Sequence, residues 1–296
     1  MGGTEIAGRD SPIGSTGRDA GDHAENAARR ASPWVEKLAR FGYAAKGVVY
    51  IVMGVLAVLL AAGLGGSMTD QAGTLRAMES VPFGRAMLGV MAAGLLGYVL
   101  WRSVQAVMDP DEDCADLKGI ATRLGYAGSA LIHAGFAFTA GRLALGVDEG
   151  EGSSSGSWTA WLLSQPLGWL ILATIGAGVV GGGLFQIYEA YHAEFRKYLK
   201  LGEMGDGTNG WIEHGGRFGV AARGVVFVII GVFLSLAAFH SDVQEVRSFG
   251  GALAAVLYQP FFGDLLLGLV AFGLVAYGLL MIAVARYRRI APHKGL

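Results

Sequence analysis

The chain has 296 residues, of which 53% are hydrophobic and only 16% are charged, and its formal net charge is −1. An ordinary soluble domain carries roughly 25% charged residues, and a nucleic-acid-binding domain usually shows a basic surplus. The composition therefore indicates a membrane protein. The lack of a basic surplus argues against a nucleic-acid-binding protein. The single cysteine, Cys114, excludes an intramolecular disulfide.

The N-terminal segment, residues 1–32, is rich in Gly, Ser, Asp, Arg and Ala and has few large apolar side chains. Such a segment cannot bury enough surface to offset the entropy lost on ordering, so we predict a disordered tail. The first apolar run begins only near Val48, which does not fit a secretory signal.

Six apolar runs follow, and each has the length of about 20 residues that a membrane-spanning helix needs. They cover residues 44–64, 84–108, 124–145, 167–190, 220–239 and 263–285. Buried core helices of a large soluble protein are the alternative, but six runs with so few charges argue against it. We predict an all-α membrane protein with six transmembrane helices.

Lysine and arginine gather before the first span, between the fourth and fifth spans, and after the sixth, whereas the loop 146–166 has neither. Cytoplasmic loops carry such a basic excess. We therefore expect a multi-pass protein of the bacterial cytoplasmic membrane with both termini in the cytoplasm. The loop between the second and third spans should also be cytoplasmic. It supports this orientation only weakly, because it is mostly acidic, although it does hold Lys118 and Arg123.

One phrase occurs three times, at the start of each odd-numbered span. It reads RFGYAAKGVVYIVMG from Arg40, RLGYAGSALIHAGFA from Arg123 and RFGVAARGVVFVIIG from Arg217. Recurrence at a long period indicates a copied structural unit.

The even-numbered spans repeat as well. Each begins just after a proline, at Pro82, Pro166 and Pro260, and continues as a glycine-rich run. Proline is well tolerated in the first turn of a helix. A short apolar segment precedes each proline, and we expect it to lie along the outer membrane surface.

The unit is therefore a hairpin of two spans, repeated over residues 33–110, 111–200 and 210–290. A unit with two spans returns to its starting side, so the three repeats have parallel orientation, and parallel repeats are related by an axis along the membrane normal. A pseudo-threefold bundle is one arrangement, and a linear row of hairpins is the other.

With R-[FL]-G-[YV]-A before each first span and P-x(1,2)-G before each second span, the chain resembles the bacterial integral membrane family known as domain of unknown function 1206. The resemblance covers about residues 34–290. It implies the repeated membrane architecture and brings no catalytic residues. The middle repeat departs most, with Ser129 where the others have Lys46 and Arg223, and His133 where they have an aromatic residue.

Arg40, Arg123 and Arg217 hold equivalent positions at the cytoplasmic edge. Around a threefold axis they would form a ring for an anion or a lipid headgroup, because guanidinium binds phosphate in bidentate fashion. Alternatively, each arginine anchors its helix by extending to the interface. Lys46 and Arg223 lie six positions further in, on a different helix face, where they either snorkel to headgroups or face the bundle.

His133 lies well inside the third span, and an intramembrane ionisable residue is a functional-site hypothesis by default. It is a hydrogen-bonded neutral histidine, a proton or ion site, or a haem ligand, and the last lacks a second histidine at matching depth. Arg102 and Glu189 lie near the cytoplasmic ends of their spans and are candidates for a pair across helices. Asp264 suits the first turn of the sixth span.

The acidic loop 109–119 fails the EF-hand pattern, because Cys114 and Ile120 stand where glycine and glutamate belong. Nucleotide-loop, metalloprotease and hydrolase motifs are absent from the sequence. We therefore expect no metal, cofactor or enzymatic activity.

We predict a non-enzymatic role with membrane lipids, other membrane proteins or a second copy of the chain as partners. The alternative is a transporter or channel for a small solute or ion along the pseudo-threefold axis.

Overall fold

The computed structural model describes residues 13–108, 117–147, 155–260 and 262–288, and within these ranges the fold is all-helical. The long helices are α1 (Ile13–Ala61), α3 (Gly84–Met108), α4 (Leu117–Ala144), α6 (Gly168–His192), α7 (Asp206–His240) and α9 (Gly263–Tyr287). The short helices are α2 (Gln71–Glu79), α5 (Ser155–Leu163) and α8 (Phe249–Leu257). Most of the predicted acidic loop, including Cys114, lies outside the described residues.

Five stretches of the described chain are long and apolar enough to cross a membrane. They are Glu36–Ala61, Gly84–Val107, Gly168–His192, Asn209–His240 and Gly263–Tyr287. These correspond to five of the six predicted spans. The third predicted span forms most of α4 but is not among the five, because Ser129, His133 and several glycines dilute its apolar character.

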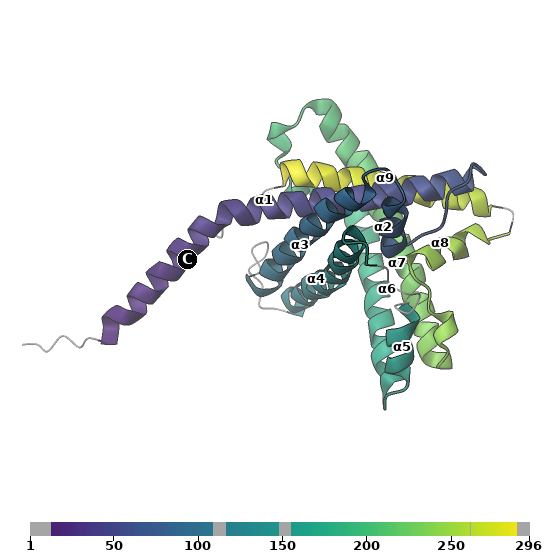
Figure 1. Ribbon diagram of the computed structural model, residues 1–296, viewed down its shortest axis with the longest axis horizontal. Coiled ribbons are helices and arrows are strands. Elements are labelled where there is room, and N and C mark those ends of the chain that lie inside the picture. The colour runs from purple at the N-terminus through teal and green to yellow at the C-terminus, as the bar shows by residue number, and fades with distance from the viewer. Residues whose placement is uncertain (1–12, 109–116, 148–154, 261, 289–296) are drawn as a thin grey trace, which may run out of the picture.

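Helix α1 is longer than predicted, because it starts at Ile13 and runs for 49 residues. The predicted disordered tail of 1–32 therefore differs from the structure from Ile13 onward, and residues 1–12 lie outside the described residues. The segment that precedes the membrane part contains AENAARRA, and alanine, glutamate and arginine are good helix formers. Extending an existing helix avoids the cost of nucleation. Figure 1 shows this part of α1 reaching away from the other helices.

The segments before the three prolines form the nine-residue helices α2, α5 and α8. Asp70 caps α2 by accepting a hydrogen bond from the Gly73 amide at 2.8 Å, and Ser248 caps α8 in the same way from Gly251 at 3.3 Å. Helix α2 packs against α1, α3 and α4, and α8 packs against α7 and α9. Each repeat thus contains one short helix between its two spans. The position of these helices at a membrane surface stays a prediction.

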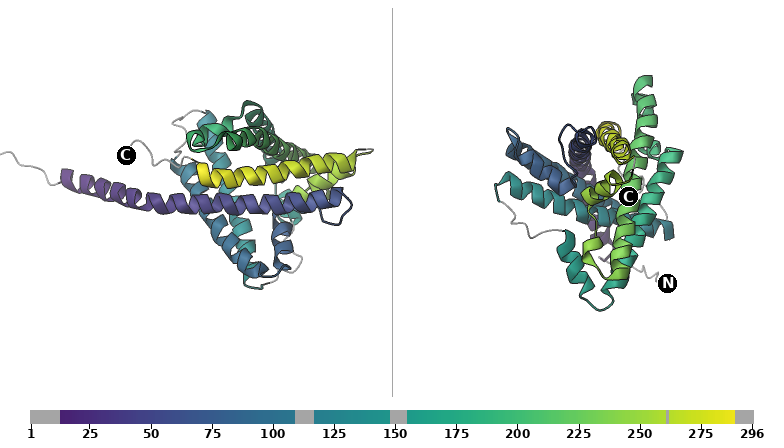
Figure 2. Two further views of the ribbon diagram at one scale, coloured as in Figure 1. Left: turned by 90° about the horizontal axis from the view of Figure 1, so that it is seen from above. Right: turned by 90° about the vertical axis from the view of Figure 1, so that its right-hand side faces the viewer.

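The long helices associate as three pairs, α1 with α9, α3 with α4, and α6 with α7. Figures 1 and 2 show that the pairs run in clearly different directions. Each pair joins the second span of one repeat to the first span of another, so that α9 at the end of the chain lies beside α1. Within the repeats, α1 also contacts α3, and α7 contacts α9, but no comparable contact joins α4 to α6 in the described residues. Within the described part of the chain, the contact between the two spans of a repeat is therefore missing in the middle repeat.

Glycines allow two of these pairs to pack backbone against backbone. A Cβ on Gly47 would lie 2.7 Å from the Gly278 carbonyl oxygen, and one on Gly224 would lie 2.8 Å from that of Gly183. Gly47 and Gly224 hold the same place in repeats one and three, which explains why the α1/α9 and α6/α7 contacts are alike. Small residues let membrane helices approach closely in this way.

Candidate functional site

The centre of the bundle contains a lysine that does not reach toward solvent. Lys46 on α1 is only 4% exposed, and its Nζ donates a hydrogen bond of 3.0 Å to the Tyr98 hydroxyl on α3. The ammonium also lies 4.7 Å from the centre of the Tyr98 ring and 5.9 Å from that of Tyr277 on α9. Both geometries are those of cation–π contacts. Lys46 is therefore held among the helices, which is the second of the two orientations considered from the sequence.

Arg102 on α3 binds the same hydroxyl group. Its Nε donates to Tyr98 Oη at 2.8 Å, and a terminal nitrogen donates to Gln105 Oε1 at 2.9 Å. The guanidinium carbon lies 5.2 Å from the centre of the Tyr98 ring and 4.9 Å from that of Tyr126 on α4. One tyrosine oxygen thus accepts hydrogen bonds from two cations.

Arg223 on α7 repeats this arrangement with a second tyrosine. Its Nε donates to the Tyr50 hydroxyl at 3.0 Å, and a terminal nitrogen donates to Gln186 Oε1 on α6. Its guanidinium carbon lies 5.0 Å from the centre of the Tyr277 ring, the ring that Lys46 also faces. The three side chains therefore form one group, which we call the cation cluster: Lys46, Arg102 and Arg223.

The cation cluster lacks matching negative charge. Among the described residues, no carboxylate lies within 4.0 Å of its three side chains. Glu189 on α6 interacts electrostatically with Arg223 and Arg102 but forms an ion pair with neither, so the pair expected between Arg102 and Glu189 is not made. Among the described residues, the three cationic side chains therefore have no ion-pair partner. Buried charges are normally paired, so this arrangement is unusual.

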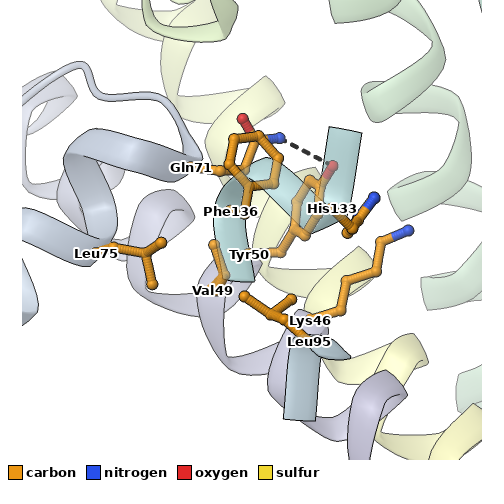
Figure 3. A pocket seen from close by; sticks show the side chains of 8 residues that line it. All are labelled: Lys46, Val49, Tyr50, Gln71, Leu75, Leu95, His133 and Phe136. Carbon is orange, nitrogen blue, oxygen red and sulfur yellow. Dashed lines mark hydrogen bonds between the residues drawn. The ribbon is translucent and has the colours of Figure 1, made fainter. Parts of the chain in front are cut away.

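His133 lies beside the cation cluster without joining its hydrogen bonds. Its Nδ1 is 2.8 Å from the Ser129 carbonyl oxygen of its own helix, and its ring centre is 4.6 Å from that of Tyr98. His133, Lys46 and Tyr50 border a cavity of ≈ 10 Å³, which is about the smallest space that holds one water molecule. Figure 3 shows this cavity, with Gln71 from α2 reaching the Tyr50 hydroxyl.

The three arginines that were predicted to form a ring have different surroundings in the structure. Arg40 donates to the Ala285 carbonyl oxygen at 2.8 Å and to that of Arg288 at 3.3 Å, and it pairs with Glu36 at 2.7 Å. Basic side chains commonly bind the last carbonyls of a helix in this way, so Arg40 caps α9. Arg217 lies 3.9 Å from Glu213, and Arg123 is exposed on α4. A shared anion site for the three remains a prediction.

The tyrosines that hold the cations are not among the site residues predicted from the sequence. Tyr98 and Tyr277 occupy equivalent places in the second spans of repeats one and three, where the middle repeat has Gly182. An aromatic hydroxyl recurring at one depth beside a glycine-rich run was the available signal. No group of three or more His, Cys, Asp or Glu side chains suited to a metal ion occurs among the described residues.

Comparison with known proteins finds the same threefold repeat. The family model described as "Domain of Unknown Function (DUF1206)" matches residues 41–109, 124–193 and 218–288. A protein of Bacillus subtilis (strain 168) named "Uncharacterized protein YxxB" is 34% identical over 239 residues, which make up 81% of this chain and 86% of that protein. No solved structure matches the chain.

Proposed function

This chain belongs to the family described as Domain of Unknown Function (DUF1206), and from that premise we propose that it is a non-enzymatic membrane protein whose cation cluster binds an anionic, phosphate-like group. The observation that carries the proposal is that three cationic side chains inside the bundle have no carboxylate, among the described residues, in an ion pair with them. The hydrogen-bond acceptors of Lys46, Arg102 and Arg223 are tyrosine and amide oxygens.

The energetics favour a charged ligand. Removing a cation from water costs several kcal/mol even after the protein relaxes, and a hydrogen bond to a charged group returns about 1.5–3 kcal/mol of that. Two guanidinium groups and an ammonium also suit phosphate, because arginine binds its oxygens in bidentate fashion and lysine acts as a point charge. An anion bound among the three would offset both the desolvation and their mutual repulsion.

The proposed architecture places three parallel two-helix repeats around a pseudo-threefold axis, with α4 as the sixth span and both termini in the cytoplasm of a bacterial cell. Packing of α9 against α1 supports a ring, because a linear row would leave the first and last helices apart. The equivalent glycine contacts of α1/α9 and α6/α7 support the same symmetry. Basic residues at the same ends of the spans support the orientation.

Transport along the axis is supported less well than binding. The cavity beside the cation cluster has room for about one water, and the rings of Tyr50 and Tyr277 pack 4.8 Å apart between centres. A conducting path would need a continuous polar passage.

A binding experiment with the full chain tests the proposal. The protein is purified in a neutral detergent, depleted of lipid, and titrated with inorganic phosphate while its melting temperature is followed. We expect phosphate to raise the melting temperature of the wild type and to have a much smaller effect on Lys46→Met. The control is Lys200→Met, because Lys200 is 39% exposed and lies outside the cluster. Equal phosphate shifts in all three proteins would contradict the proposal.

The same proteins reconstituted in liposomes separate binding from transport. We expect no phosphate or chloride flux above that of empty liposomes. Flux that Lys46→Met abolishes would replace the binding role by the transport alternative.

A further inference from the structure

The first and second spans are locked together by glycines in two of the three repeats. In repeat one, a Cβ on Gly42 would overlap the backbone of Tyr98, and in repeat three a Cβ on Gly219 would overlap that of Tyr277. Both glycines follow the repeated arginine by two positions. In these repeats the helix contact is so close that no other molecule fits between the spans.

The middle repeat has the same glycine but not the same contact. Gly125 is the equivalent of Gly42, and Gly182 stands where Tyr98 and Tyr277 stand, yet a Cβ on either glycine would meet nothing within 4 Å. Helix α6 is correspondingly open, since 17% of its apolar window is buried, against 39% to 44% in the other four candidate spans. We call the region between α4 and α6 the open side.

The cation cluster extends to both edges of the open side. Arg102 packs on Tyr126 of α4, and Arg223 donates a hydrogen bond to Gln186 of α6. Both arginines are half-buried, whereas Lys46 is almost fully buried. The two arginines thus contact the helices on either side of the open side, and the described residues of α4 and α6 share no extensive contact.

Helices α4 and α6, which flank the open side, expose large apolar side chains. Leu131 and Ile132 of α4 are 76% and 57% exposed, and Leu184 and Phe185 of α6 are 55% and 54% exposed. In a membrane such side chains face acyl chains, because these are as apolar as leucine. A ligand bound here would contact apolar side chains with one part and the cation cluster with another. An anionic phospholipid has both parts, because its acyl chains are apolar and its headgroup is negatively charged.

The depth of the cluster agrees with a lipid headgroup. Arg40 marks the end of the bundle, because it caps the last turn of α9, and Lys46 lies six positions further along α1. At 1.5 Å per residue this places the lysine about 9 Å inward. Headgroup phosphates lie just outside the hydrocarbon core, so a modest displacement toward the bilayer centre brings one to the cations.

We infer that a phospholipid with a net negative charge binds through the open side, with its phosphate at Lys46, Arg102 and Arg223 and its acyl chains along α4 and α6. This inference rests on the proposed anion site and adds the identity of the ligand and its route. Lipid binding would explain why α4 and α6 are not packed together. If they met as the two spans of the other repeats do, the lipid could not reach the cations.

Two substitutions block the route without touching the cations. Gly182→Leu on α6 and Gly128→Leu on α4 add bulk to the open side, where a Cβ at either position has no neighbour within 4 Å. Gly210→Leu is the matched control, because its Cβ is equally unobstructed near the start of α7, away from the cluster. Elution as a single species in size-exclusion chromatography checks that each variant folds.

Native mass spectrometry then measures binding of phosphatidylglycerol, phosphatidylcholine and soluble glycerol phosphate to delipidated protein. We expect the wild type and Gly210→Leu to bind phosphatidylglycerol at one molecule per chain and at least tenfold more tightly than phosphatidylcholine. Gly182→Leu and Gly128→Leu should each weaken phosphatidylglycerol at least tenfold and leave the weaker binding of glycerol phosphate within twofold.

The outcomes distinguish the inference from the proposed function. If Lys46→Met loses glycerol phosphate while both leucine variants bind phosphatidylglycerol as the wild type does, the anion site stands and the lipid route is wrong. If the wild type binds glycerol phosphate as tightly as phosphatidylglycerol, the natural ligand is a soluble anion and the inference is again wrong. If Lys46→Met changes neither ligand, both proposals fail.

Discussion

Replacing Lys46 by methionine should make the lipid-free protein more stable, although it removes a buried hydrogen bond. Lys46 Nζ and Arg102 Nε bind the same Tyr98 hydroxyl at 3.0 Å and 2.8 Å. The two nitrogens are therefore no more than about 6 Å apart, and at an effective dielectric constant of about 20 their repulsion amounts to about 3 kcal/mol. Arg223, which faces the same Tyr277 ring as Lys46, adds to it.

The opposing losses are smaller than the combined gains. A hydrogen bond to a charged group contributes about 1.5–3 kcal/mol, and the ring contacts contribute about 0.5–2 kcal/mol. Removing the ammonium relieves the repulsion and also the desolvation of the ion, which is worth several kcal/mol. Methionine keeps the unbranched apolar stem, so packing changes little. We expect a net stabilisation of about 1–3 kcal/mol, or a melting temperature higher by about 2–4 °C per kcal/mol.

The assay is thermal unfolding followed by tryptophan fluorescence, with wild type, Lys46→Met and Lys200→Met delipidated in a neutral detergent. Lys200→Met should lie within about 0.5 kcal/mol of the wild type, as is usual for surface substitutions. Adding phosphatidylglycerol should stabilise the wild type more than Lys46→Met, because a ligand stabilises the state that binds it. A lower melting temperature for Lys46→Met without lipid would refute the reasoning, since the lysine would then be a net stabilising residue.

Three further substitutions, two of them with a matched control, test other parts of the structure by the same thermal assay. Tyr98→Phe removes the oxygen that binds two cations and should destabilise the protein by about 3 kcal/mol; an unchanged melting temperature would contradict the shared hydrogen bonds. Gly278→Ala should cost about 1–3 kcal/mol because its Cβ would lie 2.7 Å from a carbonyl oxygen of α1, while Gly181→Ala, whose Cβ has no neighbour, should be neutral or stabilise by up to about 1 kcal/mol. Arg40→Gln should lower stability by about 1 kcal/mol through the lost cap of α9, and Arg85→Gln, at a 62% exposed side chain, should have almost no effect; equal effects would rule out the capping role.

Length and hydropathy are properties of single segments, and they were sufficient to predict most of the helices. Five of the six predicted spans are apolar enough to cross a membrane, and the segment before each proline forms a short helix. The same local reasoning was less successful at residues 13–32, because this segment of few large apolar side chains continues the helix that follows it. The third predicted span forms most of α4 but is not among the five, because Ser129 and His133 weaken the apolar run.

The family and the number of repeats also came from the sequence, because a copied unit leaves its arginines and prolines at regular intervals. Comparison with known proteins confirmed the family and the three copies. The repeat could not show that α4 and α6 stay apart, however, because Gly125 has the same sequence context as the tightly packed Gly42.

The cation cluster was decided by the tertiary structure. Lys46, Arg102 and Arg223 were recognised as ionisable residues in apolar segments, but a long basic side chain at that depth reaches either the headgroups or the interior, and its own helix does not determine which. The choice depends on Tyr98 and Tyr277, which come from helices distant in the sequence and supply an oxygen and a ring where the cations meet. Hydrophobicity along the chain thus determined which segments form helices, whereas contacts between distant helices determined which charges lie together, because only packing sets the direction in which each helix face points.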